Sequence, residues 1–337
     1  MDMKEIRQTA KGKMKGYCRV CPSCDGRACA GEVPGMGGTG TGQAFQENLA
    51  ALEQYKLNMR TIHDAKEPDT STTLLGLKLK TPIMAAPITG TTYNMGGALT
   101  EGEFIQAVMT GSLMAGSLGW SGDGADPTMY NSGLEAIKKE QGMGIAIIKP
   151  RSQEEIIKRI KEAEAVGAKA VGIDIDGAGL VTMALKGQPV GPKTMDELKE
   201  VINSTSLPFI LKGIMTVEEA ELAAEVGAAV IVVSNHGGRV LDQTPGAADV
   251  LPEIVEAVKG RLTILADGGV RSGVDALKLL ALGADGVLVG RPVIIGAFGG
   301  GAEGVKAVLE KYTAELQQGM ILTGCKSVVE IHEDVVC

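Results

Sequence analysis

With 337 residues, the chain has room for one large α/β barrel or for two ordinary domains. Hydrophobic residues make up 44% and charged residues 22%, which is typical of a globular protein and excludes disorder over most of the chain. Lys and Arg total 33 against 41 Asp and Glu, and the resulting net charge of −8 argues against nucleic acid or an anionic membrane as a partner.

The amino terminus is polar and rich in lysine, and a short helix is predicted within residues 4–15. It lacks the apolar core of a signal peptide, and no apolar run approaches the ~20 residues that a membrane span needs. We therefore expect a cytoplasmic protein.

A cysteine-rich segment follows, and it holds four of the six cysteines: Cys18, Cys21, Cys24 and Cys29. Thiolates at this spacing can converge on one soft metal centre, so zinc or an iron–sulfur cluster is a candidate guest. The spacing differs from common cluster runs, because four residues instead of three precede the last cysteine. A redox-active or disulfide-forming segment, or four reduced thiols in a loop, are the alternatives.

Three further features precede the main repeat. The run GMGGTGTG at 35–42 lacks the Lys-Ser/Thr ending of a nucleotide-binding loop and has no preceding strand, so it is interpreted as a flexible linker. Residues 45–55 have a helical pattern, and 74–80 predict a hairpin arm. These features divide the chain into a Cys-rich and helical extension at 1–73 and a main domain at 74–337.

From residue 82 onward, one strand–helix unit repeats eight times. The predicted strands are 83–86, 113–116, 145–148, 170–175, 208–211, 230–233, 262–266 and 286–289. The helices that follow them are predicted at 101–110, 134–140, 153–166, 195–203, 217–226, 247–258, 273–282 and 304–317. This number of units in about 240 residues predicts a TIM (β/α)8 barrel. An open doubly wound sheet is the rival, but no Gly-rich dinucleotide motif follows the first strand.

The stretch VIVVSNHGGRVLD at 230–242 places His236 and Arg239 directly after a buried strand. In parallel α/β folds the chemistry lies at the carboxyl ends of the strands. An imidazole can move a proton, and a guanidinium can hold a carboxylate through two hydrogen bonds. The pair therefore predicts a site for a small anionic substrate, although a structural His and a solvated Arg are the plain alternative.

Other predicted strand ends also carry polar groups. Lys212 closes the fifth strand, where burial is costly unless its ammonium meets an anion or a polarisable ring. The seventh and eighth strands end in ADGGVRSG and GRP. Glycines that expose backbone N–H groups, a helix N-terminus and two arginines together predict a phosphate site there.

The run SNHGGRVLD, followed by ADGGVRSGVDALKLLALGADGVLVGRP, is similar to the signature of the FMN-dependent α-hydroxy-acid oxidases and dehydrogenases, which include glycolate oxidase and lactate oxidase. The likeness runs from about residue 74 to the carboxyl-terminal LTGCKSVVEI. It implies a TIM barrel that binds FMN and oxidises a small 2-hydroxy acid of the lactate or glycolate type to the 2-oxo acid. It also implies a homo-oligomer, a tetramer or an octamer, and leaves open which electron acceptor reoxidises the flavin.

By this resemblance, His236 is the catalytic base, which takes either the hydroxyl or the α-carbon proton. Arg239 is the clamp on the substrate carboxylate, and Lys212 stabilises the reduced flavin. The implied cofactor-binding residues are Pro87, Ile88, Thr89, Ser117, Asp174, Lys212, Ser234, Asp267, Gly268, Gly269, Arg271, Gly290 and Arg291.

The chain also departs from the family pattern. After the third predicted strand, where the family has a Gln and a substrate-binding Tyr, this chain has Gly144, Ile145 and Ala146. Asp174 stands where a Thr is expected, and no second substrate Arg is found between residues 177 and 193. The alternatives are an FMN barrel with other chemistry, similar to the flavin type of isopentenyl diphosphate isomerase through the run APITG, and a flavin- or metal-binding redox sensor.

Overall fold

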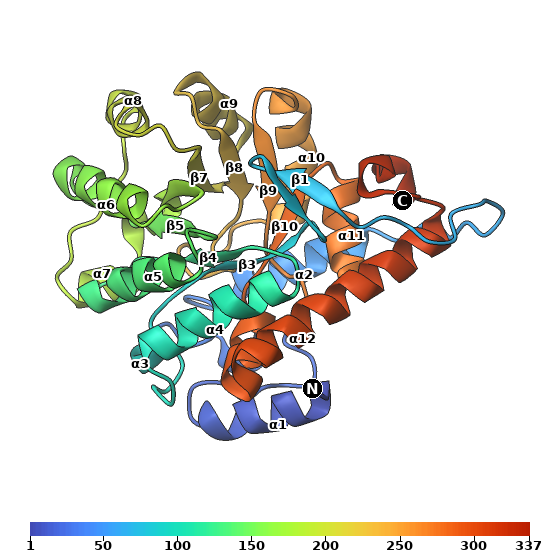
Figure 1. Ribbon diagram of the computed structural model, residues 1–337, viewed down its shortest axis with the longest axis horizontal. Helices are drawn as coiled ribbons and strands as arrows, with labels where there is room; N and C mark the ends of the chain where they lie inside the picture. The colour runs from blue at the N-terminus through green and yellow to red at the C-terminus, as the bar shows by residue number, and fades with distance from the viewer.

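A closed barrel of eight parallel strands forms the centre of the computed structural model, which describes residues 1–337 (Figure 1). Around the barrel the strands follow the order β10-β3-β4-β5-β6-β7-β8-β9, so sequence neighbours are also spatial neighbours. The strands are β3 (Ile83–Ile88), β4 (Gly119–Ser121), β5 (Ile145–Ile148), β6 (Ala170–Asp174), β7 (Phe209–Ile214), β8 (Val230–Val233), β9 (Thr263–Ala266) and β10 (Gly286–Val289). The predicted TIM barrel is confirmed.

Helices surround the barrel, and polar caps begin several of them. Thr100 and Thr194 each form a capping box with the Glu three residues later, which satisfies backbone N–H groups at the helix start. The helices outside the barrel are α3 (Thr91–Asn94), α4 (Glu101–Met114), α5 (Pro127–Lys139), α6 (Gln153–Ala165), α7 (Val181–Leu185), α8 (Met195–Asn203), α9 (Val217–Glu225), α10 (Ala247–Val258), α11 (Gly273–Ala281) and α12 (Arg291–Thr323).

Two apolar cores hold the barrel together. Alternate strand residues point inward, and side chains such as Met84, Trp120 and Val232 fill the interior. Leu74 and Leu79 join this inner core from the hairpin of β1 (Thr72–Leu74) and β2 (Leu77–Leu79). The larger core lies between the strands and the helices. The hairpin predicted at 74–80 is therefore confirmed and adds apolar side chains to the barrel interior.

The second predicted strand was wrong. Residues 113–116 form the end of α4 and the turn after it, while the strand itself is Gly119–Ser121. Leu113 packs against the inner core from the last turn of α4 and Met114 is exposed, so this apolar run marks the end of a helix instead of a strand. The predicted helix at 134–140 also begins earlier, because Asp126 caps α5 through the backbone N–H of Thr128.

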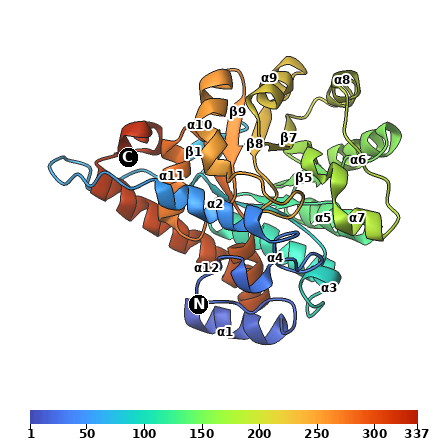
Figure 2. The same cartoon turned by 180° about the vertical axis from the view of Figure 1, so that it is seen from behind.

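The first 73 residues pack along the barrel and are not a separate body. They contain α1 (Met3–Lys13), which lies against α12, a short 3₁₀ turn η1 (Arg27–Cys29) and α2 (Gln43–Gln54), which packs on α10. Figure 2 shows α2 on the face that Figure 1 turns away from the viewer, and both views show α1 at the lower edge of the molecule. Residues 35–42, here called the strap, connect η1 to α2. Its backbone contacts Arg239, Arg291 and the carboxylate of Asp242, so the prediction of a flexible linker was wrong.

One helix, α12, has the length and apolar composition that a membrane span needs, with a window of mean hydropathy 1.3, but 61% of that window is buried inside the fold. It packs against α1, α4 and α11. Its backbone leaves the helical conformation at Gly301 (φ 58°), which joins two helical segments at a kink. These contacts are those of a core helix.

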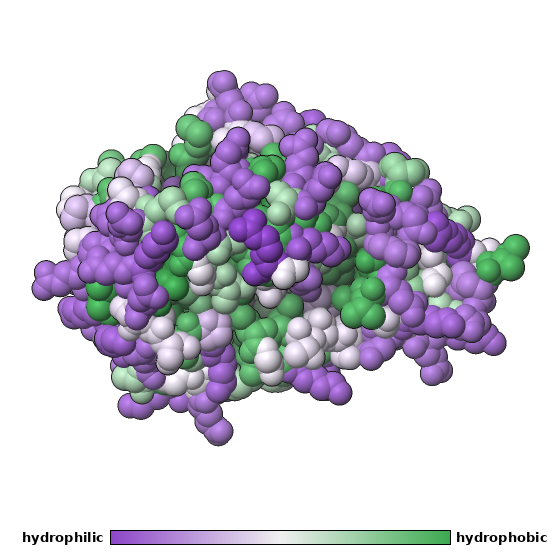
Figure 3. Space-filling model, turned by 90° about the horizontal axis from the view of Figure 1, so that it is seen from above, coloured by the Kyte–Doolittle hydropathy of each residue, from purple (hydrophilic) through white to green (hydrophobic).

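The surface is dominated by polar side chains. Figure 3 shows hydrophilic residues over most of one face, with apolar atoms in the gaps between them. The loop before β1 protrudes from the body of the molecule in Figure 1 and carries the exposed side chains of Met59 and Ile62.

Candidate active site

A cavity lies at the carboxyl ends of the barrel strands and has an empty volume of about 1110 Å³, counted out to its open mouth. This is the end at which parallel barrels place their chemistry. Its wall includes most of the residues that the sequence singled out, together with the strap residues Gly35 and Met36. The predicted residues in the wall are Pro87, Ile88, Thr89, Asp174, Lys212, His236, Arg239, Asp267, Gly268, Gly269, Arg271, Gly290 and Arg291.

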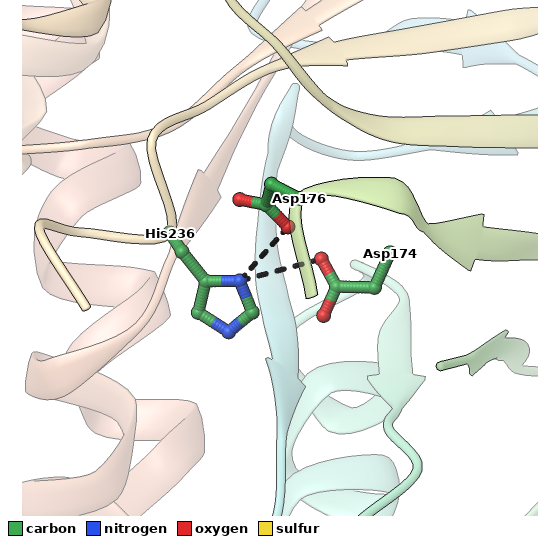
Figure 4. Close-up of side chains that lie close together, drawn as sticks. All are labelled: Asp174, Asp176 and His236. Atoms are coloured by element: carbon green, nitrogen blue, oxygen red, sulfur yellow. Dashed lines mark hydrogen bonds and ion pairs between the residues drawn. The ribbon is translucent and has the colours of Figure 1, made fainter. Parts of the chain in front are cut away.

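His236 lies in the loop after β8 and is held by two carboxylates. Its Nδ1 is 3.1 Å from Asp176 Oδ1 and 3.4 Å from Asp174 Oδ1. Figure 4 shows both carboxylates on the Nδ1 side of the ring, with Nε2 on the opposite side. The His236 backbone is left-handed (φ 60°), and its N–H donates to Ser234 Oγ at 3.1 Å. An acidic group on Nδ1 fixes the tautomer and leaves Nε2 as the basic nitrogen.

The approach of Asp176 to His236 depends on a glycine in the neighbouring strand. The β7–β8 register shifts between Lys212 and Ile214, which is the position of Gly213 (φ 102°). A side chain at Gly213 would collide with the carboxyl group of Asp176. The strand irregularity therefore makes room for the carboxylate that orients the imidazole.

Asp174 is the centre of a buried ion cluster. Its Oδ2 is 2.5 Å from Lys149 Nζ, and its Oδ1 is 3.5 Å from Lys212 Nζ. Lys212 Nζ also donates to Ser234 Oγ at 3.0 Å and lies 3.6 Å from Asp267 Oδ2. We call Lys149, Asp174, Asp176, Lys212 and His236 the acid–base cluster. Ser234 is buried and does not line the cavity, but its Oγ accepts hydrogen bonds from Lys212 Nζ and from the backbone N–H of His236.

The two carboxylates of the acid–base cluster titrate in opposite directions. Burial raises the pKa of Asp174, but the charges of His236, Lys149 and Lys212 outweigh it and hold the pKa well below its usual value. Burial also raises the pKa of Asp176, and repulsion from Asp174 adds to this beyond what attraction by His236 offsets. Burial lowers the pKa of Lys212, but its acidic neighbours raise it above the ordinary value overall. Lys212 is therefore a fixed cation.

Three arginines that also line the cavity lack acidic partners: Arg239, Arg271 and Arg291, here called the arginine cluster. Burial lowers the pKa of Arg239 to about 10. Burial lowers the pKa of Arg291 to about 9, and the charges of Arg239 and Arg271 contribute to this shift. Arg291 stacks on the Phe45 ring at 3.8 Å and Arg271 lies 5.5 Å from it. Neighbouring cations that lack anions predict an anionic ligand.

The strap holds two of these arginines through main-chain carbonyls. Arg239 NH1 donates to Gly35 O (2.6 Å) and Gly37 O (3.1 Å). Arg291 Nε donates to Met36 O and its NH2 to Gly37 O, both at 2.9 Å. Arg239 NH2 also donates to Asn94 Oδ1 at 3.2 Å. Carbonyl oxygens orient the guanidinium groups without neutralising them.

Ser117 does not reach the cavity, so its predicted role was wrong. It precedes β4, and its buried Oγ donates to Ile83 O at 2.5 Å, at the first residue of β3. This is the amino end of the barrel. The misplaced second strand caused the error, because it made Ser117 seem to follow a strand.

The sequence did not reveal Asp176 as a partner of His236, nor Lys149 as a partner of Asp174, although both residues follow buried strands. It also missed Asp123, which follows β4, lines the cavity and binds Arg151 Nε at 2.8 Å and Arg159 NH1 at 3.3 Å. Tyr93 was missed as well; it lies in α3 and lines the cavity. Charged residues after buried strands were the available signal for three of these four.

The four cysteines of the predicted metal site line a second, smaller cavity with an empty volume of about 450 Å³. All four are free thiols. Arg291 and Met36 contribute to both cavities, so the cysteines lie directly behind the arginine cluster. Metal binding there stays a prediction.

Three comparisons with known proteins agree with this geometry. The family described as FMN-dependent dehydrogenase matches residues 35–184 and 178–337. The chain is 35% identical to 2-hydroxyacid oxidase 2 of Bos taurus over 325 residues, which cover 86% of this chain and 88% of that protein. It is 32% identical to L-lactate oxidase of Nostoc sp. over 342 residues, with 88% and 90% covered. Among solved structures, mandelate oxidase has a TM-score of 0.82 at 28% identity and covers 99% of this chain and 97% of its own.

The match spans the barrel and the strap. The chain therefore belongs to the family of FMN-dependent α-hydroxy-acid oxidases and dehydrogenases, and it is an FMN-dependent oxidoreductase.

Proposed function

We propose that this protein oxidises a small 2-hydroxy acid to the 2-oxo acid, with His236 as the base and Arg239 as the carboxylate clamp. One observation carries the proposal. The Nδ1 of His236 is occupied by Asp176, so the free Nε2 and a guanidinium without an acidic partner line the same cavity. A base and a cation on one cavity wall suit a substrate that carries both an acidic proton and a carboxylate.

His236 takes a substrate proton at Nε2 and becomes a cation. Asp176 and Asp174 then stabilise that cation through Nδ1, because both carboxylates lie within 3.4 Å of it. This arrangement resembles other enzymes in which a buried acid orients a catalytic imidazole. Asp176 is therefore a positioning residue for the proton transfer.

Arg239 has donors left for a carboxylate. Its guanidinium has five N–H groups, and three of them are used by Gly35, Gly37 and Asn94. The Nε–H and one NH2 hydrogen remain for two substrate oxygens. The hydroxyl of Tyr93 adds a neutral donor, since burial raises its pKa to about 12. Its present acceptor is Met129 Sδ at 3.2 Å, which is a weak acceptor that a carboxylate would displace.

The remaining wall fits FMN. Two buried polar atoms in it, Asp267 Oδ1 and Arg271 NH2, have no hydrogen-bond partner within the protein. The ribityl hydroxyls and the phosphate of FMN offer the donors and the anion that these atoms lack. Arg271 and Arg291 would hold the phosphate, Asp267 the ribityl chain and Lys212 the flavin ring, while residues 87–89 line another part of the wall. When bound, FMN supplies the two-electron acceptor for the substrate.

The test is anaerobic reduction of the bound flavin by a panel of short 2-hydroxy acids. The reduction is monitored as the loss of the absorbance of the oxidised flavin. We expect at least one acid to bleach the flavin and to yield the corresponding 2-oxo acid. A matched panel of 2-deoxy acids with the same carboxylate should bind without bleaching. Failure of every hydroxy acid to bleach a flavin that dithionite reduces would contradict the proposal.

A further inference from the structure

The cysteine-rich segment has the features of a built metal site. Cys18, Cys21, Cys24 and Cys29 come from a loop of twelve residues and all line one cavity. The loop is anchored from two sides: Arg7 NH2 donates to Cys21 O at 2.5 Å, and Arg271 Nε donates to Cys24 O at 3.0 Å. The backbone N–H of Val20 donates to Cys18 Sγ at 3.4 Å. Backbone N–H groups directed at sulfur are one of the means by which proteins tune iron–sulfur centres.

The spacing of the sulfur atoms distinguishes between possible metal centres. Four thiolates around one zinc ion, each with a Zn–S bond of about 2.3 Å, must lie roughly 3.8 Å apart. The only group of three or more potential ligands within 4.8 Å of one another is Asp174, Asp176 and His236, so the four sulfur atoms are more widely spread than zinc requires. A cluster of four irons binds each thiolate through a different iron and therefore spreads the sulfur atoms.

The surroundings also suit an anionic cluster. The cavity wall contains the apolar side chains of Val20, Met36 and Ile295, which exclude water, and the guanidinium of Arg291, which supplies positive charge. All four cysteines are partly buried and none forms a disulfide. Burial and nearby charge are the factors that set the reduction potential of such centres.

We propose that Cys18, Cys21, Cys24 and Cys29 bind a four-iron iron–sulfur cluster, which takes electrons from the active site to an external one-electron carrier protein. Met36 and Arg291 line both cavities and form the wall between the two centres. Oxidation of one 2-hydroxy acid releases two electrons and two protons. The cluster passes the electrons singly, so two oxidised carrier proteins are reduced for each 2-oxo acid formed. This electron route rests on the proposed function, whereas cluster binding does not.

The first experiment tests the cluster alone. Protein purified without oxygen, or reconstituted with ferrous iron and sulfide, should contain about four iron atoms and four sulfide ions per chain and give a paramagnetic signal after reduction with dithionite. Single Cys→Ser changes at positions 18, 21, 24 and 29 should each remove most of the iron. Cys325→Ser and Cys337→Ser are the matched controls and should keep it, because neither residue lines this cavity. Retained FMN in every variant shows that the barrel has folded.

Three results would overturn cluster binding: one zinc ion per chain without iron, disulfides among the four cysteines under anaerobic conditions, or reconstituted protein without iron and sulfide. Each outcome is independent of turnover, so it is distinguishable from failure of the proposed function, which is read from flavin bleaching.

The second experiment tests the electron route. In protein with the cluster, addition of the 2-hydroxy acid that bleaches the flavin should also produce the signal of the reduced cluster. The Cys24→Ser variant should still show flavin bleaching by substrate, but its steady-state reduction of cytochrome c, a one-electron carrier of higher potential than the substrate, should fall at least tenfold. Unchanged cytochrome c reduction in that variant would refute the route.

Discussion

The acid–base cluster and the arginine cluster line one cavity but differ in how their buried charges are stabilised. In the first, Asp174 is paired with Lys149 and Lys212, and Asp176 is paired with His236. In the second, three guanidinium groups are held by the carbonyls of the strap and of neighbouring loops, and none has an acidic partner. A buried charge that is already paired gains little from a ligand, whereas one held only by dipoles gains much. The difference separates the residues that move protons from the residues that bind anions.

The most direct way to break this comparison is to remove the base. His236→Ala should lower the rate of flavin reduction by substrate by about 10²–10⁴-fold, because positioned proton transfer contributes that much. FMN content should not change, since FMN binding is assigned to other residues. The measurement is anaerobic stopped-flow absorbance, and His332→Ala, at an exposed position, is the matched control. A rate within threefold of the unmodified protein would contradict the role of His236.

Removal of the central carboxylate tests the paired side. Because its folded pKa is depressed, Asp174 stabilises the fold at neutral pH, and this contribution is lost as the pH falls through the folded pKa. Asp174→Asn leaves Lys149 without its acidic partner and should lower the free energy of unfolding by about 3–5 kcal/mol at pH 7. Denaturant titrations at saturating FMN should show that the difference in the free energy of unfolding between the variant and the unmodified protein narrows below about pH 4, the usual pKa of Asp. An equal difference in the free energy of unfolding at pH 7 and pH 3 would contradict the role of the Asp174 charge.

Replacement of Arg239 tests how the arginine cluster binds the carboxylate of the substrate. Arg239→Lys keeps the charge but loses the planar pair of donors, so kcat/KM for the hydroxy acid should fall by about 30–100-fold, equivalent to roughly 2–3 kcal/mol. The loss should appear mainly in KM. Arg19→Lys, a surface residue paired with Glu32, is the control and should leave both constants unchanged.

The smallest expected effect concerns the arginines that are proposed to bind the phosphate of FMN. Arg271→Ala removes one charge-assisted hydrogen-bond donor and should weaken FMN binding by about 10–100-fold, as expected for a bond worth roughly 1.5–3 kcal/mol. Riboflavin lacks the phosphate, so its dissociation constant should change by less than threefold. Equal weakening of FMN and riboflavin would place Arg271 away from the phosphate. Flavin fluorescence titration of the apoprotein measures both constants.

The sequence predicts the barrel well because each buried strand is a short apolar run and each helix has a wide apolar face. It therefore predicts which residues lie at the carboxyl ends of the strands, including Lys212 and His236. It fails at β4, because that strand is only three residues, begins with Gly119 and follows a helix whose last turn is equally apolar. The Asp176–His236 contact also escapes prediction, since it depends on two loop conformations and on the strand irregularity at Gly213.

The strap was misread for a related reason. A Gly-rich run predicts flexibility when it is isolated, but here the absence of side chains lets the main chain approach its neighbours closely. A Cβ atom at Gly37 would collide with the carbonyl oxygen of Cys29, and one at Gly38 would crowd Phe45. Only the folded context reveals that these glycines are required by packing.

The grip of the strap on Arg239 and Arg291 has an evolutionary consequence. The peptide carbonyls of Gly35, Met36 and Gly37 make the contacts, so no side chain encodes them and the identity of residue 36 can drift without loss of either hydrogen bond. Selection therefore acts on the backbone conformation of this segment. Mutational tolerance should therefore be low at Gly35 and Gly37, where a Cβ atom would collide with the backbone of Glu32 and Cys29, and higher at Met36 between them.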